Sequence, residues 1–319
     1  MLLPIVLAFA ACGTDPDSDA SPDGDQAVQL AAPGTRLVAG LVVPPGAQLV
    51  GPVFPAVPFE GGPEQTTTHA AVLELDGNPF AAWDDLARQA HDIGVAVPGS
   101  GICWWLPTSP GVGEAPPGAS VLERRPAEAD ALVCEAGARG PLMDGSQVMV
   151  QLRLWWWAAG AELHLEVTEG DMGEAPYSYP DADPGPAPAT AVDDLPERDE
   201  PSSVDVGDPF GRENNCFEVG YRRLTLPDGA RLVGGGATPG LKDFAAVLAV
   251  EDAKAVLEDL RDQLDDPDDA NGHYRLTEEN LADGTPVWVL AGGVDAGGGG
   301  CYMWSSPQGN AILVTTSSD

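Results

Sequence analysis

The chain contains one strand–turn–strand pattern twice, and this repeat restricts its fold more than any other feature. Residues 41–51 (LVVPPGAQLVG) and 224–234 (LTLPDGARLVG) agree at seven of eleven positions without a gap. After a loop, AAVLEL at 70–75 corresponds to AAVLAV at 245–250, and a helical pattern follows in each copy. The sequence therefore predicts two tandem copies of one module.

Each copy predicts one main helix. In the first, NPFAAWDDLARQAHDIG has Asn78 as the expected N-cap and Pro79 at the first helical position. In the second, Asp252 near the start suits the positive end of the helix dipole. The apolar residues of the second helix recur at spacings of three and four, which predicts one buried stripe: Ala253, Val256, Leu257, Leu260 and Leu264.

Short runs rich in β-branched and aromatic residues follow each helix and predict strands. The first copy has ICWWLP, SVLERR, ALVCEA and the start of a long hairpin, QVMVQLRLWWW. The second copy has HYRLTEE, PVWVLAG, CYMWSS and NAILVTT. The predicted fold class is therefore α+β, with two tandem copies of a small module, each an antiparallel sheet packed with one main helix.

Two segments rich in proline and acidic residues lack apolar periodicity and separate the folded parts. We expect a signal peptide at 1–11, a disordered tether at 12–32 and a first α+β module at 33–170. An acidic, Pro-rich linker at 171–215 then leads to a second α+β module at 216–319.

The N-terminal segment MLLPIVLAFAACGTDPDSD is a short apolar run that ends at Ala10 and Ala11, followed by Cys12 and a polar tail. It resembles a bacterial lipoprotein signal, which implies that Cys12 is lipidated and becomes the mature first residue. It departs from that signal at Phe9, where an aliphatic residue is usual, and no Lys or Arg precedes the run. The alternative is an ordinary signal peptide whose cleavage leaves a cysteine nearby.

With its acidic tether and its PPGAQLVG and PDGARLVG openings, the chain resembles the uncharacterised secreted lipoproteins of GC-rich, actinobacterial genomes. This resemblance implies export and implies no particular activity. Export also explains the remaining four cysteines as disulfide partners: Cys103, Cys134, Cys216 and Cys301. Four cysteines allow three pairings, of which strand order favours Cys103–Cys134 and Cys216–Cys301.

The hairpin QLRLWWWAAGAELHLEV at 151–167 contains three consecutive tryptophans. A two-residue turn at Ala159–Gly160 puts Trp156 on a wholly apolar face and Trp155 and Trp157 on a mixed face, because strand side chains alternate. The sequence thus predicts that Trp156 belongs to the core.

An alignment of Gly160 with Gly309 in the second copy matches Trp155 with Trp304. Two interpretations remain open. Either a helix or the other copy covers both residues, or they form an exposed aromatic platform that stacks on sugar rings or on apolar groups of a partner.

Composition and motifs exclude some functions and identify no reaction. The net charge of -35 repels phosphate backbones, so we expect no nucleic-acid partner and membrane contact only through the lipid on Cys12. The sequence has no HExxH, CxxC or GxSxG motif, so it predicts no metal, no cofactor and no identifiable catalytic residue. Among 50 acidic residues a close carboxylate pair arises by chance, so glycosidase chemistry does not follow.

The leading hypothesis is a lipid-anchored extracytoplasmic protein, at the cell surface or in the periplasm. Its two duplicated modules would have a non-catalytic role in binding or envelope interaction, with an extracytoplasmic ligand or envelope protein as partner. The alternative is a secreted hydrolase, for example one directed at glycans, whose carboxylates converge only in the fold.

Overall fold

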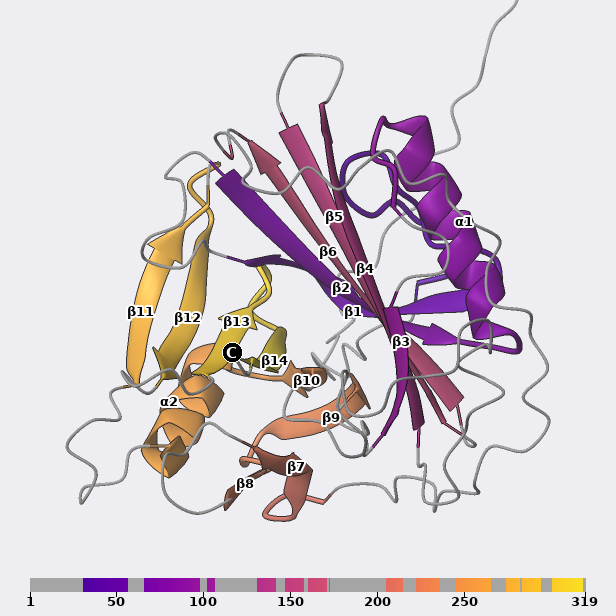
Figure 1. The fold of residues 1–319 in the computed structure, drawn as a ribbon. Coiled ribbons are helices and arrows are strands. Elements are labelled where there is room, and N and C mark those ends of the chain that lie inside the picture. Colours follow the sequence, from indigo (N-terminus) through magenta and orange to yellow (C-terminus); the bar gives the residue numbers. More distant parts are fainter. Residues whose placement is uncertain are drawn as a thin grey trace, which may run out of the picture.

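The computed structural model (Figure 1) describes two sheet-based halves of the chain. The described residues are 31–56, 66–97, 102–106, 131–141, 147–157, 160–170, 172, 205–214, 222–235, 245–264, 274–281, 283–293 and 300–317. The signal peptide, Cys12, Cys216 and the strand expected at SVLERR lie outside the described residues.

The first half contains one helix and a six-stranded antiparallel sheet in the order β1-β2-β6-β5-β4-β3. Its elements are β1 (Ala47–Ala56), β2 (Thr66–Leu75), α1 (Pro79–Asp92), β3 (Ile102–Leu106), β4 (Ala131–Pro141), β5 (Gln147–Trp157) and β6 (Gly160–Gly170). The second half has the elements β9 (Ala230–Gly235), β10 (Ala245–Val250), α2 (Ala253–Leu264), β11 (Arg275–Asn280), β12 (Pro286–Gly293), β13 (Gly300–Ser305) and β14 (Ala311–Ser317). Its sheet order, read from β9, is β9-β10-β14-β13-β12-β11, which matches the first sheet strand for strand.

A separate two-stranded sheet pairs β7 (Pro209–Asn214) with β8 (Arg222–Thr225). The last residues of the expected linker therefore form a strand. With two helices beside fourteen strands in the described part of the chain, the protein is mainly β with some helix. The two antiparallel, sheet-based halves agree with the prediction. The predicted class, α+β, is more specific than this mainly β content supports.

The repeat extends to the strand register. Leu49 pairs with Leu73 in the first half, and the sequence-aligned Leu232 pairs with Leu248 in the second. In both halves the strand register shifts next to this pair. The shift lies between Val50 and Phe54 in β1, and between Val247 and Leu248 in β10. Register is set by which side chains face the core, so equal register means that the same positions are buried in both sheets.

The two helices begin and pack as the sequence predicts. Asn78 caps α1 by accepting a 3.0 Å hydrogen bond from the Phe80 amide, and Pro79 opens the helix. Asp252 caps α2 by accepting a 3.1 Å bond from the Ala255 amide. The expected stripe of α2 is buried throughout, and the aligned residues of α1 are buried too: Pro79, Ala82, Trp83, Leu86 and Ala90.

A polar contact tethers each helix to the segment before the first strand of its half. In the first half, Gln89 donates to Asp85 at 2.6 Å and accepts from the Val42 amide at 2.7 Å. In the second, Gln263 donates to Asp259 at 2.6 Å and accepts from the Thr225 amide at 2.8 Å. The same hydrogen bonds recur at aligned positions, which simple amphipathic patterning does not require.

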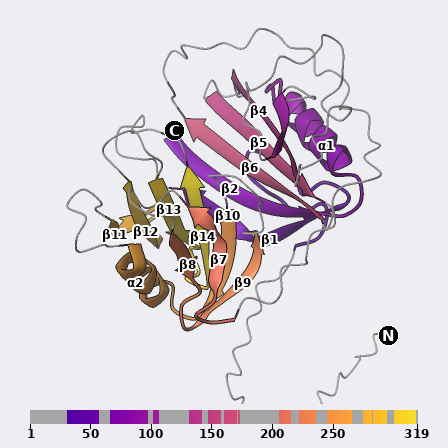
Figure 2. The same cartoon turned by 60° about the horizontal axis from the view of Figure 1, so that its bottom comes forward.

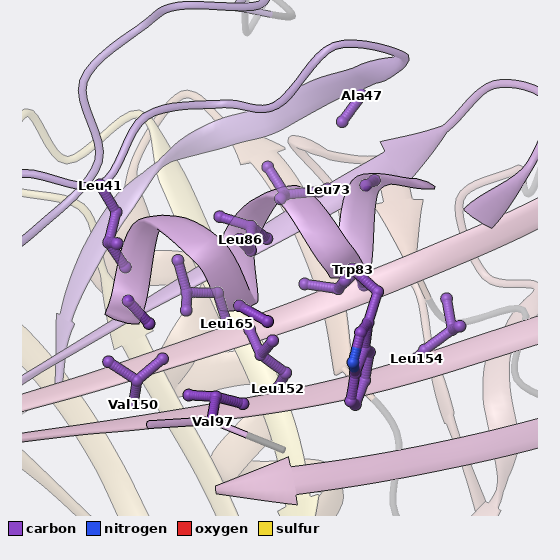
Figure 3. Packing of buried hydrophobic residues seen from close by; sticks show 14 of the residues in the cluster. Leu41, Ala47, Leu73, Trp83, Leu86, Val97, Val150, Leu152, Leu154 and Leu165 are labelled. Atoms are coloured by element: carbon purple, nitrogen blue, oxygen red, sulfur yellow. The ribbon is translucent and has the colours of Figure 1, made fainter. Parts of the chain in front are cut away.

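Each helix covers the inner face of its own sheet. Figure 3 shows Trp83 and Leu86 of α1 directed at the strand residues Leu73, Leu152 and Leu154, all of them buried. The equivalent cluster in the second half joins α2 to β10, β12, β13 and β14. The helices thereby lie on the far sides of the pair of sheets (Figures 1 and 2).

The two sheets meet through their outer faces, which point away from the helices. Val50, Phe54 and Val72 of the first sheet pack with Val247 and Leu313 of the second, and all are buried. The sheets come very close at Gly234 of β9, where a Cβ atom would lie 2.5 Å from Cγ1 of Val50. A side chain at residue 234 is therefore incompatible with the present position of the Val50 side chain.

Candidate functional site

The tryptophan hairpin has a different register from the expected one. Trp157 pairs with Gly160, so residues 158–159 form the connection, and Trp156 lies opposite Ala161 instead of Leu163. The shift is two residues, which keeps every side chain on its expected face because strand side chains alternate with a period of two. Gly160 therefore lies within β6 and does not form part of the turn.

The burial of the three tryptophans decides between the two interpretations of Trp155. Trp156 lies on the inner face, where it is partly buried and contacts Phe80 edge-on at 5.7 Å between ring centroids. Trp155 and Trp157 lie on the outer face, yet only 1 % and 5 % of their surface is exposed. They belong to a tryptophan cluster, defined here as Trp104, Trp155 and Trp157 with Ala131 and Val133. An exposed platform at Trp155 is therefore wrong.

Trp304 does not correspond to Trp155 in the sheet. It lies opposite Leu313, whose counterpart by register is His164, and His164 lies opposite Arg153. The reason is loop length, because residues 306–310 connect β13 and β14 whereas only residues 158–159 connect β5 and β6. Trp304 packs at the edge of the contact between the sheets and stacks on Tyr302 at 6.1 Å. For Trp304, cover by the other half is the correct interpretation.

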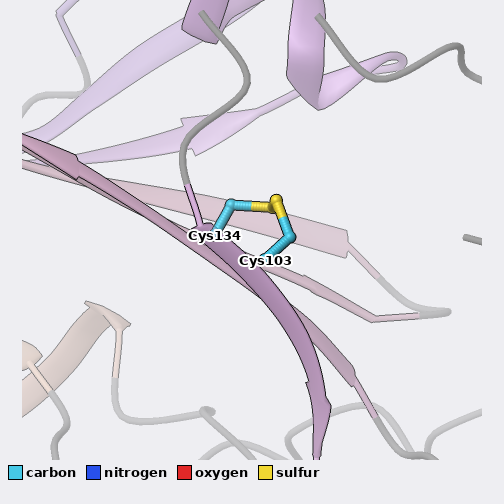
Figure 4. The surroundings of a disulfide bond; sticks show 2 residues. All are labelled: Cys103 and Cys134. Carbon is cyan, nitrogen blue, oxygen red and sulfur yellow. A yellow bond between two sulfur atoms is a disulfide. The ribbon is translucent and has the colours of Figure 1, made fainter. Parts of the chain in front are cut away.

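The cysteine predictions are met where the structure describes them. Cys103 and Cys134 form a disulfide between β3 and β4, at directly paired positions (Figure 4). Cys301 is buried and disulfide-bonded, and its expected pairing with Cys216 stays a prediction because Cys216 lies outside the described residues.

A buried polar cluster occupies the outer face of the first sheet, between the tryptophan cluster and the contact with the second sheet. We call it the Glu–His cluster and define it as Glu74, Glu162 and His164. Glu74 of β2 lies directly opposite Glu162 of β6, and Glu162 lies opposite Trp155 of β5. His164 is two residues further along β6 on the same face, with Nε2 3.6 Å from Oε2 of Glu162.

The electrostatics of this cluster are unfavourable for its acids. The Glu162 side chain is only 6 % exposed, and its Oε2 has no hydrogen-bond partner among the described residues. Burial raises the pKa of Glu74, and the nearby charges of Glu162 and Asp76 raise it further. Within the described ranges no Lys or Arg forms an ion pair with either carboxylate. The guanidinium of Arg153 on β5 pairs with Glu135 and lies 5.7 Å from the Trp155 ring centroid.

The second sheet lacks this cluster. At the register positions of Glu74, Glu162 and His164 it has Ala249, Ala311 and Leu313, which pair in the same way. Ala311 and Leu313 belong to the apolar contact between the sheets. The fold therefore forms without charges at these positions, so the Glu–His cluster is not required by the architecture.

Two further polar features of the described residues lie outside the Glu–His cluster. A shallow hollow of about 450 Å³ beside α1 is lined by Asp85, Arg88 and Gln89, which are already paired with one another. His69 lies on the opposite face of β2 from Glu74, and burial lowers its pKa while Glu169 acts in the other direction. The described residues contain no group of three or more His, Cys, Asp or Glu placed to hold a metal ion.

Sequence reasoning missed the Glu–His cluster. The signal was the one acidic difference between AAVLEL and AAVLAV, which places Glu74 where the second copy has alanine. A glutamate at a strand position that is apolar in the repeat indicates a local function or a local exposure, and here the side chain is half-buried.

Comparisons with known proteins identify no relative. No family model and no curated protein matches the chain. Among solved structures, it is compared with the dehydratase domains from the CurK and CurF modules of curacin polyketide synthase. The CurK domain is 10% identical, with 84% of this chain and 94% of that domain covered at a TM-score of 0.15. The CurF domain is 11% identical, with 84% and 95% covered at 0.12. In the described part of the chain, no helix has the length and apolar character needed to cross a bilayer.

Proposed function

We propose that the chain is a lipid-anchored extracytoplasmic protein whose two copies of one α+β module act together in non-catalytic binding at the cell envelope. The lipid is carried by Cys12, and the acidic segment after it holds the modules away from the membrane. The disulfide between Cys103 and Cys134 and the disulfide-bonded state of Cys301 support an oxidising compartment.

The observation that carries the binding role is a difference between two halves that share one framework. Both halves have the same strand order, helix cap and Gln tether, whereas only the first has the Glu–His cluster. The second half uses the matching face as an apolar contact with the first sheet. The first half is therefore the binding half, and the second half supports it. Two halves that each performed the same chemistry would both retain the polar groups.

Anchoring is tested by metabolic labelling with radioactive palmitate in a bacterial host that processes lipoproteins. The wild-type protein should incorporate label and sediment with membranes, and Cys12→Ser should lose the label and leave the membrane fraction. Label or membrane association that persists in Cys12→Ser would contradict the proposal. The binding role is tested by capture of envelope extracts and glycans on the immobilised mature ectodomain, which should retain a ligand at physiological salt.

The rival function, hydrolysis with paired carboxylates, has one observation in its favour. Directly opposed residues on antiparallel strands have Cβ atoms about 4.5–5.5 Å apart, and retaining glycosidases hold their two carboxyl groups about 5–5.5 Å apart. The raised pKa of Glu74 would also suit a general acid. Against it, Glu162 is 4 % exposed, so a glycan chain cannot reach both carboxylates. Turnover of chromogenic glycosides that is lost in Glu162→Gln would favour the rival.

A further inference from the structure

The Glu–His cluster has the composition of a receptor for positive charge. Two carboxylates face each other across β2 and β6, and no described Lys or Arg neutralises them. Desolvated charges of like sign are costly unless a counter-charge or hydrogen-bond donors compensate them. Among the described residues, the buried Oε2 of Glu162 accepts no hydrogen bond, and its ion-pair contact is with Nε2 of His164 at 3.6 Å, which carries charge only when protonated.

The surroundings favour an organic cation over a metal ion. Trp155 lies beside Glu162 and already has the Arg153 guanidinium 5.7 Å from its ring centroid, so this ring accepts a neighbouring cation. The imidazole of His164 contacts the same ring, with centroids 4.1 Å apart. An ammonium group has three N–H donors, which matches the carboxylate oxygens of Glu74 and the orphan oxygen of Glu162.

Glu74 is the more exposed member of the carboxylate pair. Glu162 is almost fully buried, whereas Glu74 is half-buried and lies next to the second sheet. A Cβ atom on Gly234 of β9 would be 3.0 Å from Oε1 of Glu74, so this carboxylate lines the junction between the sheets.

From this geometry, and on the basis of the binding role proposed above, we infer that the Glu74–Glu162 pair binds the primary ammonium group of a small ligand. The ammonium donates hydrogen bonds to both carboxylates at the junction of the two sheets. His164 and Trp155 form the wall of the site. The second sheet, with Ala249 and Ala311 at the same register, has no equivalent site.

The test uses the whole mature chain at pH 7 and n-butylammonium chloride as the probe, with tetramethylammonium chloride at the same concentration as the salt control. Tetramethylammonium has the same charge but no N–H donor. Calorimetric titration should detect binding of n-butylammonium to the wild-type protein, and the thermal midpoint should rise with n-butylammonium only, because a ligand that binds the native state stabilises it. Glu162→Gln should weaken the affinity by about tenfold or more, as expected for loss of a charge-assisted hydrogen bond.

Glu166→Gln is the matched control, since Glu166 is an exposed acid on the same face of β6 and its loss changes the net charge equally. It should bind n-butylammonium like the wild type. Glu74→Gln is the second variant and should weaken binding even if Glu162→Gln proves poorly folded by circular dichroism. Equal binding in Glu166→Gln and both cluster variants, or equal stabilisation by tetramethylammonium, would overturn the inference. If the ectodomain captures an envelope ligand and Glu162→Gln captures it equally well, the inference fails while the proposed binding role stands.

Discussion

Replacement of Gly234 by alanine should disrupt the contact between the two sheets. The new Cβ atom would lie 2.5 Å from Cγ1 and 3.2 Å from Cγ2 of Val50, both well inside normal carbon–carbon contact. Val50 cannot yield easily because it is 0 % exposed and its β-branched side chain has few rotamers. Overpacking of this kind costs about 1–3 kcal/mol, so Gly234→Ala should lower the free energy of unfolding by that amount.

The assay is urea denaturation followed by tryptophan fluorescence, with Gly137→Ala as the matched control. Gly137 is also a strand glycine, but its Cβ would meet only Gln151 Cγ at 3.4 Å and the Val150 carbonyl at 3.6 Å. Truncation of Val50 should restore space, so the Gly234→Ala/Val50→Ala double variant should be more stable than the sum of the single losses, by about 1 kcal/mol or more. Strict additivity, or a Gly234→Ala stability within about 0.5 kcal/mol of Gly137→Ala, would refute the close packing of the sheets.

Three further predictions concern the repeated framework and its charges. Gln89→Ala and Gln263→Ala should each lower the free energy of unfolding by about 1–3 kcal/mol, because each leaves a backbone amide without its acceptor. Similar losses in urea denaturation would support equivalent tethers, and a loss in one variant alone would contradict them. Burial raises the pKa of Glu74, so wild-type stability should decrease as the pH rises from about 4.5 through that raised value. Glu74→Gln should flatten this decrease, and an unchanged pH profile in that variant would exclude Glu74 as its cause. The double variant Cys103→Ser/Cys134→Ser should lose about 2–4 kcal/mol, and a reductant that destabilises it as much as the wild type would show that another bond dominates.

Local patterns predicted the helices well because their signals are local. The cap at Asn78, the proline at residue 79 and the stripe that ends at Leu264 depend on side chains within one or two helical turns. Spacing therefore determined both where each helix begins and which of its faces is buried.

The faces of the tryptophan hairpin were predictable, whereas its register and burial were not. Alternation assigned Trp155 and Trp156 to opposite faces, but the position of the turn depends on which residues bend the chain, and here Gly160 stays in the strand. The match between Trp155 and Trp304 failed for a related reason, since the connection at residues 306–310 is longer than its counterpart.

The Glu–His cluster could not be derived from spacing alone. Glu74 and Glu162 are far apart in the sequence and meet only because β6 returns to pair with β2. The contact between the sheets is equally unpredictable from spacing, because the outer face of one module is covered by the outer face of the other. Amphipathic patterning identifies a buried face, but it does not identify what buries it.

The two halves pack outer face against outer face, so that the second half completes the surroundings of Glu74. The most direct measurement is cross-linking in the double variant Val50→Cys/Gly234→Cys. The close approach at Gly234 suits the Cβ separation of about 3.5–4.5 Å that a disulfide requires. After air oxidation, intact mass should fall by two hydrogens, and a maleimide added in denaturant should label neither new cysteine, whereas it should label both new cysteines of Val50→Cys/Gly137→Cys. Labelling of both residue 50 and residue 234 after the oxidised protein is denatured would contradict the packing of the two halves.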